Sequence, residues 1–150
     1  MSGIIVGVDG SANAKYALAW AIKEAAAKHE PLTVVTVNEV AASFWTHQPI
    51  TVPADEGLLE KAREAATDLV YKAVSDLGET GTISVTVHAI NGFAADELVD
   101  ASRGADMIVV GARGGAQGGG LAQHSPLGSI SNKVLHHSHC PVVVVPAPRG

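Results

Sequence analysis

Short apolar runs alternate along this chain with segments whose apolar residues recur at helical spacing. Five such runs, rich in valine and isoleucine, predict strands over residues 3–8, 32–37, 83–89, 107–110 and 142–145. The periodicity between them predicts helices over residues 14–25, 59–77, 95–102 and 129–137. Strands that alternate with helices form a parallel sheet. The pattern therefore predicts one α/β domain over residues 1–150, an open five-stranded parallel sheet with helices on both faces, Rossmann-like in kind.

The composition excludes several classes of protein. Hydrophobic residues make up 47% of the 150 residues, which excludes intrinsic disorder, and aromatic residues only 4%, so aliphatic side chains must build the core. The net charge is −5 and no basic block occurs, which argues against a nucleic-acid partner. No apolar run approaches the ~18 residues of a membrane-spanning helix, and the first residues lack the basic start of a signal peptide. With Cys140 as the single cysteine, we expect a soluble cytoplasmic protein without membrane contact.

Two loops at the predicted carboxyl edge of the sheet are candidates for chemistry. Ligands of open parallel sheets bind beyond the carboxyl ends of the strands, where the strand order reverses. The first loop holds Asp9, whose carboxylate either accepts hydrogen bonds from a ribose or amino group or forms a turn with the following glycine. Ser11 is the expected N-cap of the first helix. The two interpretations of Asp9 stay open at this point.

The second loop follows the fourth predicted strand and is rich in glycine. Residues 111–120 contain six glycines, and the loop leads into a helix that begins Gly128-Ser129-Ile130-Ser131. Free N–H groups and a partial positive charge at a helix N-terminus favour phosphate, to which Arg113 would add a charge. The alternative is a flexible surface loop in which Ser129 only caps the helix. Neither G-x-x-x-x-G-K-[ST] nor G-x-G-x-x-G is present, so we expect no catalysis beyond a slow ATPase.

Three segments resemble the universal stress protein family: GIIVGVDGS at the start, VVGARG after the fourth strand and GSISNKVLHHSHCPVVVV near the end. The resemblance covers the whole chain and implies an α/β fold of the adenine nucleotide alpha hydrolase-like kind. One branch of the family binds ATP through an aspartate after the first strand and a G-x2-G-x9-G-[ST] motif. Carried over by position, the implied binding residues are Val8, Asp9, Val37, Gly111, Gly114, Gly128, Ser129, Ile130 and Ser131.

The spacing of the glycine motif departs from the family pattern. Thirteen residues separate Gly114 from Gly128, where the pattern has nine. A second register, Gly115 and Gly118 followed by nine residues, fits the count but begins four residues beyond the strand end. We prefer Gly111 and Gly114, because the family's first glycine follows the strand directly. The extra residues would then bulge and either reshape or cover the triphosphate site.

The resemblance implies a nucleotide-binding regulatory protein that binds ATP, with Mg²⁺ as a candidate companion, and acts in stress adaptation. The alternative is a binder of AMP or cyclic AMP, or a nucleotide-independent dimeric interaction protein. The last strand, Val142–Val145, is apolar and uncharged, so at a sheet edge it would favour a homodimer by antiparallel pairing.

Two further groups of residues have simpler explanations or stay open. His136, His137, His139 and Cys140 are zinc-ligand types, but adjacent histidines point to different sides of a helix, and histidine is favoured at helix ends. Trp20 is expected to pack in or beside the core. Phe44 and Trp45 lie in a long predicted loop over residues 38–53, where they would cover either a ligand or a partner subunit.

Overall fold

The computed structural model describes residues 2–11, 13–39, 56–78, 83–112 and 127–148. Strands and helices alternate through this part of the chain, as the sequence predicts. The elements are β1 (Ile4–Val8), α1 (Ala14–Lys28), β2 (Leu32–Glu39), α2 (Glu56–Leu77), β3 (Val85–Gly92), α3 (Ala94–Ala101), β4 (Met107–Gly111), α4 (Ser129–His137) and β5 (Val142–Val145).

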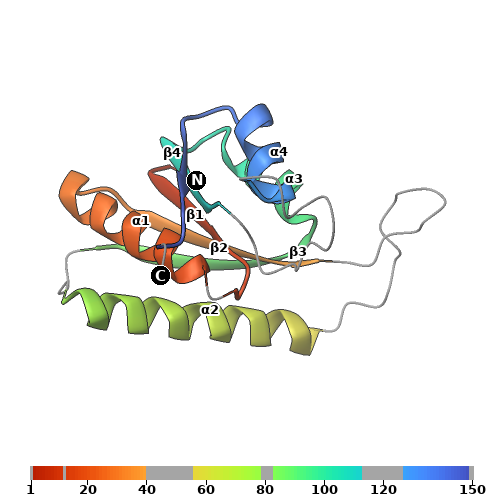
Figure 1. Cartoon of the computed structure of the whole chain (residues 1–150). Coiled ribbons are helices and arrows are strands. Elements are labelled where there is room, and N and C mark those ends of the chain that lie inside the picture. The colour runs from red at the N-terminus through yellow and green to blue at the C-terminus, as the bar shows by residue number, and fades with distance from the viewer. Residues whose placement is uncertain (1, 12, 40–55, 79–82, 113–126, 149–150) are drawn as a thin grey trace.

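The five strands form one parallel sheet in the order β3-β2-β1-β4-β5. Helices α1 and α2 cover one face of this sheet, and α3 and α4 cover the other (Figure 1). The predicted fold class is therefore confirmed. The strand order reverses at β1, which pairs with β2 on one side and with β4 on the other.

Alternate residues of the strands build two separate cores. Ile4 and Val6 of β1 face α1 and α2, where they meet buried aliphatic residues such as Leu18. Ile5, between them, faces α3 and α4 and belongs with Leu98 to the second core. Because both faces of the inner strands β1 and β4 are buried, these strands form near-continuous apolar runs in the sequence, whereas β3 alternates. Trp20 packs against the first core, as expected, while Phe44 and Trp45 lie outside the described residues.

The predicted bounds of β2 and β3 were too short at their carboxyl ends. Strand β2 continues through Asn38 to Glu39, and β3 continues to Gly92. These added residues pair across the two strands, and the Asn38 side-chain N–H donates to the Asn91 side-chain carbonyl at 3.0 Å. A cross-strand amide pair of this kind satisfies polar groups that would otherwise indicate a loop. Residues 38–39 of the predicted loop are therefore strand.

The prediction that Ser11 caps α1 is wrong. The helix begins at Ala14 after Asn13, and no side chain caps its first N–H groups. The Asp9 carboxylate instead accepts the Ser11 backbone N–H at 2.9 Å, and the Ser11 carbonyl accepts the Ala14 N–H at 3.2 Å. This turn delays the helix start and leaves the buried Ser11 hydroxyl without a hydrogen-bond partner in the described part of the chain.

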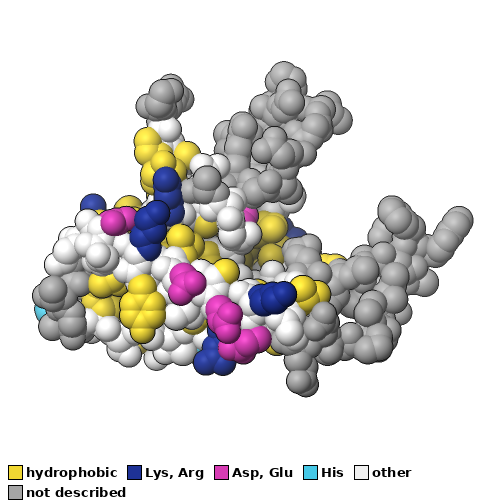
Figure 2. All heavy atoms as spheres, turned by 90° about the horizontal axis from the view of Figure 1, so that it is seen from below, with side chains coloured by type: hydrophobic (Ala, Val, Ile, Leu, Met, Phe, Trp, Pro, Cys, Tyr) yellow, Lys and Arg dark blue, Asp and Glu magenta, His cyan; other side chains and the backbone are white. Residues whose placement is uncertain are grey.

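The outer surface of α2 is polar with scattered apolar residues. Figure 2 views the molecule from below, the side of α2 in Figure 1, and shows acidic and basic side chains interspersed with hydrophobic ones. Leu58 and Tyr71 are the large apolar residues exposed on this helix. None of the described helices combines the length and the hydropathy needed to cross a bilayer.

Candidate functional site

The carboxyl ends of β1 and β4 lie side by side, and the chain leaves them toward opposite faces of the sheet. After β1 it runs to α1 on one face, and after β4 it runs to α4 on the other (Figure 1). This divergence opens the edge of a parallel sheet at the point where its strand order reverses. The sequence prediction of one shared edge requires that the first strand neighbours the fourth. This condition is met, so the described ends of the two loops lie at one edge.

Val8 and Asp9 stand at the end of β1. Val8 is the last residue of the strand, is 5% exposed and packs into the core beneath α1. Asp9 is exposed, and its Oδ1 accepts the N–H of Ser11. Asp9 therefore forms a turn, which holds its carboxylate at the strand end beside β4, and its role toward a ribose stays a prediction.

Two hydrogen bonds tie the start of α4 to the end of β4. The hydroxyl of Ser131 donates to the carbonyl of Gly111, and the N–H of Gly128 donates to the carbonyl of Ala112 at 2.6 Å. The N–H of Ala112 in turn donates to the carbonyl of Val145 at 3.0 Å, which continues the β4–β5 ladder. The two halves of the glycine motif that the resemblance implies, at Gly111 and Gly128, are therefore joined through Ser131 and Ala112.

The N-terminus of α4 presents backbone donors. Gly128 precedes the helix with φ −69° and ψ 165°, and no side chain caps it, so the alternative in which Ser129 is the cap is wrong. The N–H of Asn132 makes the bond to the Gly128 carbonyl, 3.0 Å away. The N–H groups of Ser129, Ile130 and Ser131 precede it and therefore have no acceptor within the helix. A helix start of this kind favours an anion.

The serines at this helix start have different surroundings. Ser129 is exposed, whereas Ser131 is 4% exposed and its hydroxyl is engaged by Gly111. Ser131 thus has a structural hydroxyl, and only its backbone N–H remains for an anion. Arg113 and Gly114, and the second register through Gly115 and Gly118, lie outside the described residues.

Strands β2 and β3 extend beyond the end of β1 and form a two-stranded wall. Val8 is level with Thr36, so the paired residues from Val37 to Glu39 project past it. On the side of α3, this wall presents Val37 and its partner Ile90, both half-buried. The sequence prediction included Val37 and missed Ile90, although the apolar alternation of β3 continues to that residue.

The hollow between α3 and α4 is separate from this edge. It has a volume of about 430 Å³ and is lined by Asp96, Val99, Asp100, Arg103, Lys133, His137 and His139. Lys133 bridges the two helices through an ion pair with Asp96 at 2.6 Å. No residue predicted to bind nucleotide lines this hollow. Across the described ranges, no three His, Cys, Asp or Glu side chains gather as metal ligands.

The comparisons with known proteins agree on one family. The model of the universal stress protein family matches residues 1–146. A universal stress protein of Mycolicibacterium smegmatis is 40% identical over 145 residues, which cover 95% of this chain and 47% of that protein. A universal stress protein of Mycobacterium tuberculosis is 33% identical over 147 residues, with the same coverage of 95% and 47%. The chain thus spans about half the length of these curated relatives.

Solved structures share the fold. The universal stress protein UspA from Lactobacillus plantarum superposes with a TM-score of 0.73 at 23% identity, covering 96% of this chain and 97% of that one. A universal stress protein in complex with cAMP gives 0.66 at 22% identity, covering 98% of both chains. One from Archaeoglobus fulgidus in complex with dAMP gives 0.56 at 21% identity, covering 97% and 98%.

Proposed function

Since the chain belongs to the universal stress protein family, we propose that it is a regulatory protein that binds ATP at the carboxyl edge of its sheet. Binding biases the conformation or the choice of partner, and hydrolysis is slow or absent because no P-loop lysine is present. We extend the proposal to a role in stress adaptation in the cytoplasm.

The meeting of Gly111 with the start of α4 is the observation that carries this proposal. The Ser131 hydroxyl and the Gly128 N–H hold the helix start against the end of β4. The three N–H groups that have no acceptor within the helix are thereby held at the end of β4, the strand that pairs with β1. Phosphates bind such fixed backbone donors without a lysine.

The remaining residues take roles by their place along this edge. Phosphates lie at the N–H groups of α4 with the Ser129 hydroxyl, and Gly114 and Arg113 complete this end. Asp9 accepts from the ribose, because its carboxylate stands at the end of the central strand. The base lies against Val37, one strand farther across the sheet. Mg²⁺ accompanies the phosphates as a proposal only, held by the nucleotide and water.

A second candidate ligand is a monophosphate. Two solved structures of the same fold are described in complex with cAMP and with dAMP. The spacing between Gly114 and Gly128 is four residues longer than in the ATP-binding pattern, which favours a ligand without the outer phosphates. AMP or cyclic AMP would still use the donors at the start of α4. A nucleotide-independent interaction protein is the remaining alternative.

We further propose a homodimer through β5. This strand stands at the edge of the sheet, as the sequence predicts, and its four valines are each only half-buried. An apolar edge strand without charge pairs readily with a second copy. Curated relatives of about twice this length are compatible with two such units working together.

Calorimetric titration tests the nucleotide proposal. Nucleotide-stripped protein is titrated with ATP plus Mg²⁺, then with AMP and with cyclic AMP. Gly128→Val places a branched side chain over the α4 donors and abolishes binding. Gly104→Val is the matched control. It introduces the same side chain at an exposed position after α3, away from the carboxyl end of β4.

The outcomes separate the candidates. Binding of ATP that Gly128→Val removes and Gly104→Val retains supports the phosphate site. Binding of AMP or cyclic AMP without binding of ATP would mean that the same site takes a monophosphate. If folded protein, shown by a cooperative thermal transition, gives no binding heat with any of the three ligands, the nucleotide-independent interaction protein is the remaining candidate.

A further inference from the structure

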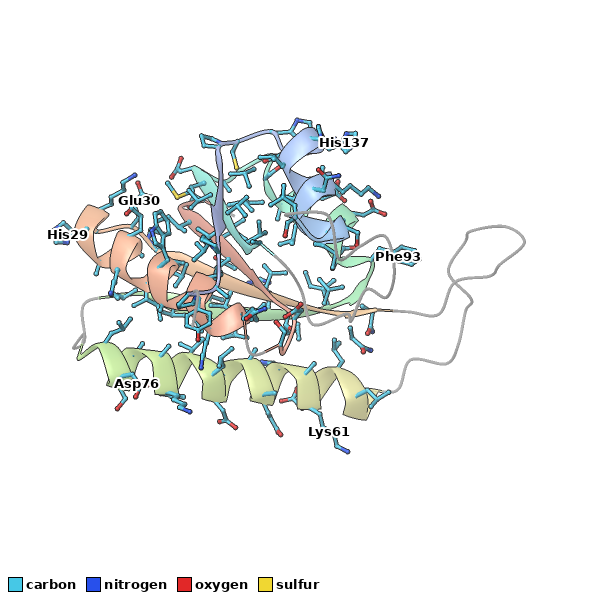
Figure 3. All side chains as sticks on the ribbon, viewed as in Figure 1. His29, Glu30, Lys61, Asp76, Phe93 and His137 are labelled. Atoms are coloured by element: carbon cyan, nitrogen blue, oxygen red, sulfur yellow. The ribbon has the colours of Figure 1, made fainter. Side chains whose placement is uncertain are left out.

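Phe93 is an aromatic residue at the carboxyl edge that the cores do not use. The chain holds only two phenylalanines, and Phe93 joins β3 to α3. Its side chain is half-buried, yet in the described part of the chain it packs against neither core cluster. Figure 3 shows the labelled Phe93 projecting away from α3 at the end of β3. Among the described residues, the two cores therefore do not account for this large apolar ring at the carboxyl edge of the sheet.

The two-stranded wall leads directly to this ring. Strands β2 and β3 continue for three residues past the level of Val8, a projection of about 10 Å at strand rise. The α3 side of the wall is formed by Val37 and Ile90, which are paired. Phe93 follows Gly92, the last residue of β3. The wall is therefore apolar at its base and aromatic at its far end.

The turn at Gly92 sends the chain toward the α3 side of the wall. Gly92 has a φ of +157°, and a Cβ there would approach Glu97 Oε1 to 2.7 Å, so the backbone passes close to the helix it enters. The Phe93 carbonyl accepts the N–H of Glu97 at 3.0 Å, which anchors the residue to the first turn of α3. Its backbone is thus held while its ring extends from the helix.

We propose that Phe93 stacks on the base of the bound nucleotide and closes the corner formed by Val37 and Ile90. This inference rests on the proposed function, because it assigns the base end of the same ligand. In the strand order, β1 and β2 lie between β4, where the phosphates bind, and β3, which leads to Phe93. Asp9 at the end of β1 and Val37 on β2 therefore come between the phosphates and the ring. Aromatic side chains hold bases by stacking, whichever base is present.

Stacking predicts a loss of affinity that depends on the base. Removal of one stacked aromatic ring weakens binding by about tenfold or more. Phe93→Ala therefore weakens ATP binding by about tenfold and leaves binding of inorganic tripolyphosphate, which has no base, unchanged. Phe93→Trp retains the ATP affinity, because indole also presents a face for stacking. Phe93→Leu keeps most of the apolar volume but has no π-face, so it should lose most of the ATP affinity that stacking contributes. This variant keeps the test valid if Phe93→Ala folds poorly.

The control is Tyr71→Ala, which removes an aromatic ring from the outer face of α2, where the side chain is 73% exposed. Thermal unfolding establishes that each variant is folded, and calorimetry measures both ligands. Equal ATP affinity of wild type, Phe93→Leu and Phe93→Ala overturns the stacking role while leaving the nucleotide site intact. An equal loss for ATP and tripolyphosphate also overturns it, since the effect is then not on the base. A wild type that binds neither ligand overturns the proposed function and the stacking role together.

Discussion

The hydroxyl of Ser131 donates to the carbonyl of Gly111, twenty positions earlier in the chain. Ser131 lies in the first turn of α4 and Gly111 is the last residue of β4, so this bond joins the start of the helix to the end of the strand. Ser131 is 4% exposed, so the bond is shielded from water. A shielded hydrogen bond is electrostatically stronger than one in water, so it holds the start of α4 against the end of β4.

Ser131→Ala should destabilise the protein by roughly 1–3 kcal/mol, because the Gly111 carbonyl loses its donor in a shielded position. Urea unfolding at constant m-value measures the loss. Ser129→Ala is the matched control, since Ser129 is exposed two residues earlier and no side-chain cap depends on it. Equal stability of the two variants would show that the Ser131 bond adds nothing to the fold.

Ser11→Ala should leave stability unchanged or slightly raised. A helix-capping serine would cost ~0.5–2 kcal/mol on removal, but the buried Ser11 hydroxyl has no partner within the described residues, so alanine removes an unsatisfied group. Asp9→Ala provides the contrast, because it deletes the acceptor of the Ser11 N–H and should cost about 1 kcal/mol. Chemical denaturation compares both with wild type. A loss in Ser11→Ala as large as that of a cap would contradict the observed turn.

Gly7→Ala should destabilise by about 1–3 kcal/mol through overpacking. A Cβ at Gly7 would lie 2.9 Å from Leu98 Cδ1, and Leu98 is 3% exposed between β1 and α3. In the double variant with Leu98→Ala, the added methyl occupies space that the smaller side chain leaves. The combined loss should therefore be smaller than the sum of the single losses in a double-mutant cycle. Additive losses would place the strain elsewhere.

The sequence predicts the bounds of helices and strands best where a proline or glycine lies next to the element. Strand β5 and helix α4 have the predicted bounds, because Pro141 cannot continue a helix and Gly128 precedes the helix start. Strand β3 extends past its predicted end, since Asn91 and Gly92 indicate a turn until their partners in β2 are known. Local patterns cannot supply a cross-strand partner fifty-three positions away, as in the Asn38–Asn91 pair.

The candidate site divides in the same way. Sequence patterns predict that Asp9 and Gly111 stand at the carboxyl ends of strands, because both come directly after apolar runs, and the structure shows that these strands are adjacent. The patterns cannot predict which hydrogen-bond donor pairs with which acceptor at this edge of the sheet. The Asp9 carboxylate accepts the N–H of Ser11, which precedes α1, while the Ser11 hydroxyl meets no partner among the described residues. The Ser131 hydroxyl meets Gly111 only because the sheet order brings α4 over β4.

The Glu24 carboxylate raises the pKa of the Lys28 ammonium above its ordinary value of 10.5, first through a hydrogen bond and then through its charge. The two groups are 3.0 Å apart, one turn from each other on α1. A folded-state pKa above the unfolded value means that the pair stabilises fully below pH 10.5 and is lost as the pH rises through the folded pKa. NMR titration of the lysine side chain should show a lower pKa in Glu24→Gln. An unchanged pKa in that variant would rule out Glu24 as the cause.

Val144→Pro should abolish the proposed dimer while keeping the monomer folded. Pro141 and Val145 offer their carbonyls to β4, so in a parallel ladder the intervening Val143 also faces β4, and the N–H of Val144 faces outward. Proline at Val144 removes that outward donor without breaking a bond to β4. Sedimentation at tens of micromolar should give a dimer for wild type and for Val144→Ala, which keeps the N–H, and a monomer for Val144→Pro. A wild type that sediments as a monomer, or a proline variant that remains dimeric, would exclude pairing through this edge, because in either case the outward N–H of β5 holds no second copy.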